Sequence, residues 1–141
     1  MTENHLISSV SLFKTLKSEK KNNGAVFTIK SCKTGKDFTY KISRSEYKGK
    51  WYTHVYVEYN YLDFNRLGTY FNGSITNKKE IVNSPSAIAI AFVLDKVEHE
   101  QFDFLDKNIE LMHSGHCLCC GKILTDANSI KLGLGPTCAN K

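Results

Sequence analysis

A cluster of cysteine and histidine residues near the C-terminus carries most of the chemistry in this 141-residue chain. Two residues separate Cys117 from Cys120, and Gly121 follows. This is the spacing of a zinc knuckle, in which a tight turn brings two thiolates to one point. Structural Zn²⁺ takes four ligands in a tetrahedron, so a third thiolate from Cys138 and one histidine would complete the site. The spacing therefore predicts one structural zinc ion.

The fourth ligand is expected upstream of the knuckle, because the three residues after Cys138 offer no strong donor. His113 lies four residues before Cys117 and can fold back toward the metal, whereas His116 is adjacent to Cys117, where neighbouring side chains usually diverge. The predicted ligands are His113, Cys117, Cys120 and Cys138, with His116 as the alternative histidine. The competing interpretation is a set of reduced thiols near a loop, without a metal.

Two further cysteines lie outside this ligand set. Cys119 alternates with the knuckle ligands and is expected to point away from the metal, and Cys32 is expected to be a plain thiol at the end of a strand. A disulfide framework fits poorly, because the cysteines cluster at one end and the N-terminus lacks the basic start and apolar run of a secretory signal. The longest apolar run, 87–94, is too short to span a bilayer. We therefore expect a cytoplasmic protein without a membrane partner.

The net charge of +5 is unevenly distributed along the chain. Residues 1–50 carry eleven Lys and Arg against four acidic residues, whereas residues 51–112 carry five against nine. Such an asymmetry indicates a basic face that could meet a polyanion, although solvated surface lysines account for much of it.

Alternating apolar and polar residues predict β-strands within residues 24–112. The alternation indicates two strands joined by a turn at Gly35 and a third strand over 51–61. A fourth strand over 66–75 is made irregular or bulged by its glycines. Residues 108–112 are expected to form a last short strand.

One helix start is marked by Ser84 and Pro85, an N-cap serine followed by proline at the first helical position. The helix that follows is apolar nearly all round over 87–94, so it is expected to be buried across the sheet. The predicted fold class is α+β, an antiparallel β-sheet packed on a buried helix with a zinc module after it. The expected units are an N-terminal arm or short helix (1–23), the α+β core (24–112) and the zinc-binding module (113–141).

The face of the sheet turned away from the helix is the predicted nucleic-acid surface. Lysines interleaved with tyrosines are typical of single-strand binding platforms, where rings stack on bases and ammonium groups hold phosphates. The same residue types also occur on ordinary solvent-exposed strands for their β-propensity. The predicted binding residues are Lys30, Lys41, Tyr52, His54, Tyr56 and Tyr70.

The C-terminal segment resembles a small zinc-binding domain of unknown function found in uncharacterised proteins of bacteriophages, prophages and other mobile elements. The resemblance rests on Cys117, Cys120, Gly121, Gly133, Gly135, Pro136 and Cys138. Those proteins often carry His-x-Gly-basic-Cys before the knuckle, which His113 to Cys117 match, and this supports His113 as the fourth ligand. The motif is treble-clef-like, with a hairpin after the knuckle and a glycine turn that delivers Cys138.

Catalytic signatures are scarce in this sequence: neither the zinc-protease, zinc-deaminase, serine-hydrolase nor phosphate-loop pattern occurs. A zinc ion with three thiolates and one imidazole is coordinatively full, which suits structure and not water activation. We therefore expect a non-enzymatic zinc-binding accessory protein of a phage or mobile element, with nucleic acid as its partner and no small-molecule substrate. The alternative is a protein-binding inhibitor of a host defence system, of the anti-CRISPR kind, acting through the acidic, aromatic segment 95–110.

Overall fold

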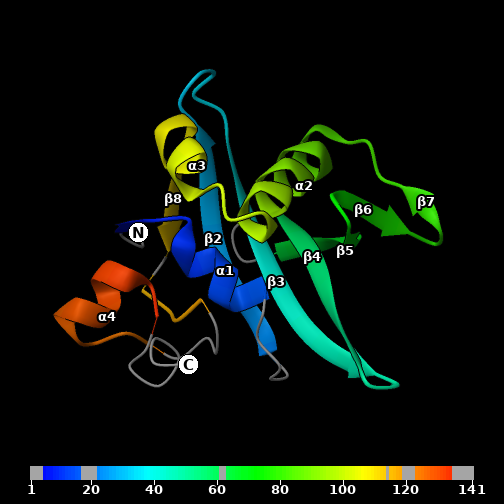
Figure 1. Cartoon of the computed structure of the whole chain (residues 1–141), viewed down its shortest axis with the longest axis horizontal. Coiled ribbons are helices and arrows are strands. Elements are labelled where there is room, and N and C mark those ends of the chain that lie inside the picture. Colours follow the sequence, from blue (N-terminus) through cyan, green and yellow to red (C-terminus); the bar gives the residue numbers. More distant parts are fainter. Residues whose placement is uncertain (1–4, 17–21, 61–62, 114, 119–122, 135–141) are drawn as a thin grey trace.

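The computed structural model describes residues 5–16, 22–60, 63–113, 115–118 and 123–134. These residues form one antiparallel eight-stranded sheet with helices on one of its faces (Figure 1). The strand order is β1-β8-β2-β3-β4-β5-β6-β7. The strands are β1 (His5–Ile7), β2 (Asn22–Ser31), β3 (Asp37–Tyr47), β4 (Lys50–Asn60), β5 (Asp63–Phe71), β6 (Ser74–Asn77), β7 (Glu80–Ile81) and β8 (Ile109–His113). The helices are α1 (Val10–Leu16), α2 (Pro85–Glu98), α3 (Phe102–Asn108) and α4 (Ala127–Leu132). The α+β class and the antiparallel sheet predicted from the sequence are confirmed.

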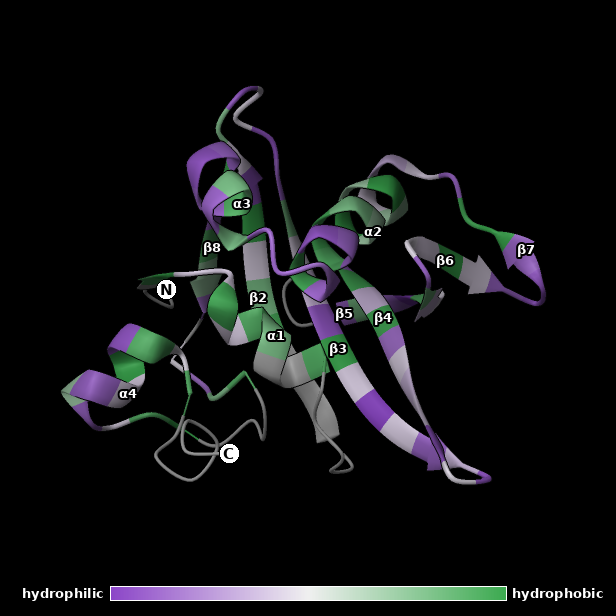
Figure 2. Ribbon diagram, viewed as in Figure 1, coloured by the Kyte–Doolittle hydropathy of each residue, from purple (hydrophilic) through white to green (hydrophobic). Residues whose placement is uncertain are grey.

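The centre of the sheet is a meander, in which each strand from β2 to β6 pairs with the next. Gly35 has a φ of 74° in the turn between β2 and β3, as the predicted hairpin requires. Lys48 and Gly49 both have left-handed backbones, so β3 and β4 are joined by a two-residue turn that matches the twist of the strands. This hairpin projects beyond the helices, and polar residues dominate its end (Figures 1 and 2).

Helix α2 begins where the sequence predicts. Ser84 has an extended backbone, and its Oγ accepts a hydrogen bond from the Ala87 N–H at 3.4 Å. The apolar length of α2 (Figure 2) is not buried all round as expected: Ile90 and Leu94 are fully buried, but Ile88 is 57% and Phe92 45% exposed. The helix therefore covers the sheet with one face and presents apolar side chains on another.

The core lies between the sheet and helices α1, α2 and α3. Phe27, Tyr40 and Ile42 are at most 1% exposed on the covered face, and the Tyr40 hydroxyl donates to the Ser86 carbonyl at 2.7 Å. Leu105 of α3 is fully buried. Because a hydroxyl in such a site needs a partner, the Tyr40 bond also fixes how α2 lies across β3.

Both ends of the described chain join the same edge of the sheet. β8 inserts beside β2, and β1 pairs on its outer side, with Leu6 opposite Met112. Helix α4 contacts β1. The expected boundaries after residues 23 and 112 both fall inside strands, β2 and β8, so the sheet is continuous across them. None of the described helices is long and apolar enough to cross a membrane.

Candidate functional site

His113 ends β8 on the helix-covered face and is fully buried. Its Nε2 lies 2.6 Å from the Ile130 carbonyl oxygen of α4, and its Nδ1 accepts a hydrogen bond from the Gly115 N–H at 2.9 Å. Because a carbonyl oxygen only accepts, Nε2 carries the ring proton, and the lone pair of Nδ1 is engaged by the Gly115 N–H. A metal-binding histidine often has its second N–H on a carbonyl in this way, and a metal at Nδ1 would have to replace the hydrogen bond from the Gly115 N–H.

Gly133 lets α4 approach the His113 ring. It caps α4 in the left-handed conformation, with a φ of 73°. A Cβ at this position would lie 3.1 Å from Cδ2 of His113 and 3.0 Å from Cδ1 of Ile7. Any larger residue would therefore be strained and would push α4 away from the ring that Ile130 holds.

The described parts of the knuckle lie against the same glycine. Cys117 and Leu118 are fully buried, and the Leu118 N–H donates to the Gly133 carbonyl at 2.8 Å. His116 pairs with Ile123 in an antiparallel bridge, and the Leu124 N–H donates to the Gly115 carbonyl at 2.8 Å, so the described segments 115–118 and 123–124 lie side by side. The side chain of His116 is exposed. Of the predicted ligands, the structure thus describes His113 and Cys117; Cys120 and Cys138, like Cys119, lie outside the described residues. Cys32 is exposed at the end of β2, far along the chain from this site.

Helix α4, which supplies the carbonyl for His113, has its own start signal. Asp126 is the N-cap, and its Oδ2 accepts hydrogen bonds from the N–H groups of Asn128 and Ser129 at 3.1 and 3.2 Å. A helix of this length depends on such caps and on packing for its stability. The sequence gives no signal that Ile130 contacts His113, because the contact is made by its backbone carbonyl, a group that every residue type has.

The uncovered face of the sheet brings several predicted binding residues together. Lys41 lies opposite Tyr56, and its Nζ is 4.9 Å from the Tyr56 ring centroid and 5.1 Å from that of Phe64. Tyr52 and His54 follow on the same side of β4. Sequence reasoning missed Phe64, because residue 64 precedes the expected start of its strand.

Lys30 lies on the same face in a different setting. Its cross-strand neighbours are Asp37 on β3 and Glu110 on β8. Two carboxylates beside one ammonium group leave little net positive charge there. The basic character of the face therefore centres on Lys41 and Arg66, and not on Lys30.

His54 is held in its neutral form at the centre of this face. Its Nε2 lies 2.7 Å from Ser45 Oγ, and its Nδ1 lies 3.4 Å from both Thr69 Oγ1 and Arg66 Nη2. Burial lowers the pKa of His54, and the positive charges of Arg66 and Arg44 lower it further. His54 is thus a hydrogen-bonding group near neutral pH and not a cation.

The prediction that Tyr70 lies on the uncovered face is wrong. Tyr70 is 7% exposed on the helix side, and its hydroxyl donates to Glu98 Oε1 of α2 at 3.3 Å. The reason is a bulge: Tyr56 pairs with Arg66 but Val55 pairs with Gly68, so one extra residue reverses the alternation of β5. Counting in twos from Arg66 therefore assigns Tyr70 to the opposite face.

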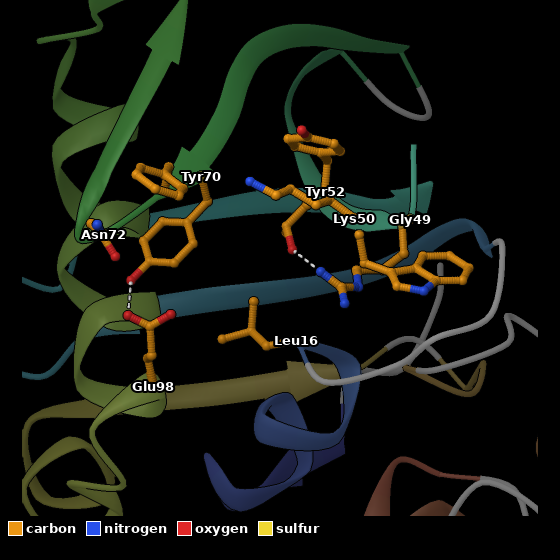
Figure 3. Close-up of a pocket in the computed structure, with 11 residues that line it drawn as sticks. Leu16, Gly49, Lys50, Tyr52, Tyr70, Asn72 and Glu98 are labelled. Carbon is orange, nitrogen blue, oxygen red and sulfur yellow. Dashed lines mark hydrogen bonds between the residues drawn. The ribbon is translucent and has the colours of Figure 1, made fainter. Parts of the chain in front are cut away.

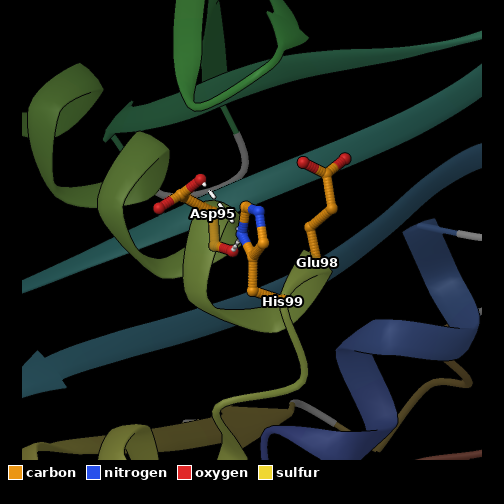
Figure 4. Close-up of side chains that lie close together, drawn as sticks. All are labelled: Asp95, Glu98 and His99. Carbon is orange, nitrogen blue, oxygen red and sulfur yellow. Dashed lines mark hydrogen bonds and ion pairs between the residues drawn. The ribbon is translucent and has the colours of Figure 1, made fainter.

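A second group of potential ligands lies at the end of α2 (Figure 4). Asp95, Glu98 and His99 are the one cluster of three metal-type side chains within the described part of the chain. His99 Nδ1 donates to the Asp95 carbonyl at 2.8 Å and lies 3.4 Å from its carboxylate, while Glu98 accepts the Tyr70 hydroxyl. These contacts account for the cluster as a helix end, where a histidine caps the last carbonyls.

A comparison with known protein families found a match to this C-terminal region. Residues 112–141 match a family of unknown function (DUF6011). The match begins one residue before His113 and includes every predicted zinc ligand. No curated protein and no solved structure matches the chain. The comparison therefore supports a distinct small C-terminal segment and assigns it no activity.

Proposed function

We propose that residues 113–138 bind one structural zinc ion through His113, Cys117, Cys120 and Cys138. The observation that carries this proposal is the setting of His113, whose Nε2–H is fixed by the Ile130 carbonyl and whose Nδ1 would exchange its hydrogen bond from the Gly115 N–H for the metal. Three thiolates and one imidazole are a donor set that Zn²⁺ prefers. The role of the zinc ion would be to hold a treble-clef-like module together, since so small a segment has little hydrophobic core of its own.

The contrast between the two histidines favours His113 as the ligand. His113 and Cys117 are both fully buried, whereas His116 is exposed in the bridge to Ile123. A ligand in a closed structural site is shielded from water together with its thiolates. His116 is therefore better explained as a solvent-facing residue of this bridge.

Zinc content in variants tests this site directly. Protein purified without chelator should hold one zinc per chain, and His113→Asn and Cys117→Ser should lose it because each removes one of four ligands. His116→Asn and Cys119→Ser are the matched controls and should keep it. Less than half an equivalent in the wild type, or loss in the His116 variant with retention in the His113 variant, would refute the ligand set.

We further propose that the protein binds single-stranded nucleic acid with little sequence preference and catalyses no reaction. Lys41 between the rings of Tyr56 and Phe64 supports this, because such a group offers stacking surface and a cation within one site. With the resemblance to mobile-element proteins, the setting we propose is the cytoplasm of a bacterial host.

One observation favours the alternative, a protein-binding inhibitor of a host defence system. Phe104 of α3 is 46% exposed, with its ring 6.2 Å from that of Phe92. The rest of segment 95–110 supports it less: Leu105 is buried, and Asp106 accepts hydrogen bonds from Ser8 Oγ and Ser9 N at 2.7 and 2.8 Å. Nucleic-acid binding remains our first proposal.

Binding of labelled single- and double-stranded oligonucleotides across a salt series separates these possibilities. Lys41→Glu should weaken single-strand binding and make the slope of log K against log salt shallower by about 0.7, the loss of roughly one phosphate contact. Lys107→Glu, an exposed lysine of α3, is the control and should leave both unchanged. No binding at low salt would exclude the proposal and leave the inhibitor.

A further inference from the structure

An apolar groove lies between the turn that joins β2 to β3 and the helices α2 and α3. Its volume is ≈ 590 Å³. The groove is lined by the core residues Ile29 and Val93 and by the exposed side chains of Ile88, Phe92 and Phe104. Single exposed apolar residues are ordinary on a protein surface, whereas neighbouring ones with polar residues around them mark an interaction site.

The walls of this groove are tied to one another. The Cys32 N–H of the β2–β3 turn donates to the Asn108 carbonyl at the end of α3, at 3.0 Å. Asn108 Nδ2 donates to the Phe104 carbonyl at 2.7 Å, and the Phe104 ring lies 6.2 Å from the ring of Phe92 on α2. The groove is therefore already formed, and a partner would not have to order it on binding.

The charged side chains that line the groove, among the described residues, are lysines. Lys33 and Lys36 of the turn are both exposed. Lys96 adds a third ammonium group, with its Nζ 5.5 Å from the ring centroids of Phe92 and Phe104. The carboxylate of Asp95 lies 3.4 Å from His99 Nδ1, and Asp95 lines the neighbouring groove instead. A partner for this surface would thus combine apolar side chains with negative charge.

The groove at the base of the β3–β4 hairpin is different (Figure 3). There Arg44 Nη1 donates to Thr53 Oγ1 at 2.8 Å, and Glu98 Oε1 accepts from the Tyr70 hydroxyl at 3.3 Å. A ligand would have to compete with these internal bonds, whereas the lysines of the β2–β3 turn extend into solvent.

The backbone beneath the α2–α3 groove favours a helical partner. β2 pairs with β3 on one side and with β8 on the other, so Ile29 lies in a strand without a free edge. An extended peptide laid on the groove would leave its own N–H and C=O groups against apolar side chains without partners. An α-helix satisfies these groups internally and buries one apolar face.

We propose that this groove docks an acidic amphipathic α-helix of a partner protein, with its apolar face on the exposed rings and its carboxylates toward the three lysines. The groove lies on the helix-covered side of the sheet, away from Lys41, so the proposal does not rest on nucleic-acid binding. It shares Phe104 with the inhibitor alternative but reverses the charge, because here the partner supplies the carboxylates. A second copy of the chain is a weaker occupant, since a net charge of +5 on each copy opposes the contact.

Two synthetic helices test the proposal. The probe is a fluorescein-labelled amphipathic peptide of about 18 residues, long enough to form a helix, with Leu on one face and Glu on the other. Its twin carries Lys at every Glu position. Fluorescence anisotropy should give a Kd of about 100 μM or lower for the Glu peptide and at least about tenfold higher for the Lys peptide. Amide chemical shifts should change in the turn 31–36 and along α2 and α3.

Matched variants separate the apolar and the charged contributions. Ile88→Gln should weaken binding of the Glu peptide by roughly fivefold or more, because it removes apolar contact area. Ile81→Gln is the control: Ile81 is 62% exposed, against 57% for Ile88, and lies outside this groove. Lys33→Glu combined with Lys36→Glu should invert the preference between the two peptides. Lys48→Glu with Lys50→Glu changes the net charge equally on the β3–β4 hairpin and should keep the preference for the Glu peptide.

Several results would overturn the proposal. They are no binding of the Glu peptide at millimolar concentration, shift changes confined to other surfaces, equal losses in Ile88→Gln and Ile81→Gln, or an unchanged preference in the Lys33 and Lys36 double variant. Sedimentation showing a dimer that Ile88→Gln abolishes would identify a second copy as the occupant, and tighter binding of decanoate than of the Glu peptide would identify an anionic amphiphile. Oligonucleotide binding should be the same in Ile88→Gln as in the wild type, so a failure here leaves the nucleic-acid proposal standing.

Discussion

At the scale of single residues, the two glycines Gly133 and Gly35 show what a close approach costs. Both have left-handed backbones, with φ of 73° and 74°. Gly133 is also pressed against His113 and Ile7, whereas a Cβ on Gly35 would meet nothing within 4 Å. The same substitution at the two positions therefore separates backbone strain from lost packing.

We expect Gly35→Ala to lower the free energy of unfolding by about 1 kcal/mol, the cost of a left-handed alanine. Gly133→Ala should cost roughly 2–3 kcal/mol, because the added methyl also displaces α4 from the His113 ring. Chemical denaturation of both variants measures the difference. Equal costs would show that the packing of α4 on His113 contributes nothing.

His54 gives a prediction about pH. Its pKa is below the ordinary value of 6.5 in the folded protein, so the unfolded chain takes up the proton first as pH falls. The stability that neutral His54 contributes is present above the unfolded pKa and is lost as pH falls through the folded pKa. Between pH of about 7.5 and about 5, the wild type should therefore lose more stability than His54→Gln, which keeps a hydrogen-bonding group but cannot titrate. Parallel curves for the two proteins over this range would contradict the assignment.

At the scale of elements, the sequence correctly predicted the turns, strands and helix starts that depend on residues close together in the chain. The turn at Gly35, the strand near residue 110 and the start of α2 at Ser84 all follow from residue type and spacing. Pairing across the chain did not follow from the sequence. β1 has three residues, too few for a period to be recognised, and it is stabilised by β8, more than a hundred positions away. The bulge at Gly68 likewise depends on a neighbour, since a Cβ there would collide with the Thr76 backbone on β6.

The cap of α2 can be tested with one position and two replacements. Ser84→Ala removes the acceptor for the Ala87 N–H and should lower the free energy of unfolding by about 1 kcal/mol. Ser84→Asp keeps an acceptor and adds a negative charge at the helix N-terminus, so stability should be retained or slightly raised. Thermal or urea unfolding distinguishes the two, and an equal loss in both variants would show that the cap is unimportant.

At the scale of the whole molecule, the candidate zinc module is built into the edge of the sheet. His113 is both the last residue of β8 and the predicted ligand, α4 contacts β1, and Gly133 contacts Ile7 of β1 (Figure 1). The sequence predicted an appendix after residue 112, because ligand spacing describes a local motif and carries no information on what the motif packs against. Within the described residues, the candidate metal site is linked to β1 and β8, the first and last described strands.

Metal removal should therefore loosen more than the C-terminal segment. If His113 is a zinc ligand as proposed, removal of the metal takes away one support of its ring, and with it a support of α4 and β1. We expect chelation to speed hydrogen exchange of the amides in β1 and β8 by at least about tenfold, equivalent to about 1.4 kcal/mol of local stability, while the β3–β4 pair stays protected. Cys119→Ser, which removes a thiol outside the predicted ligand set, is the control. Treated with chelator in the same way, it should behave as the wild type. Unchanged exchange in β1 and β8 after the metal has left would show that the module is a separate appendix.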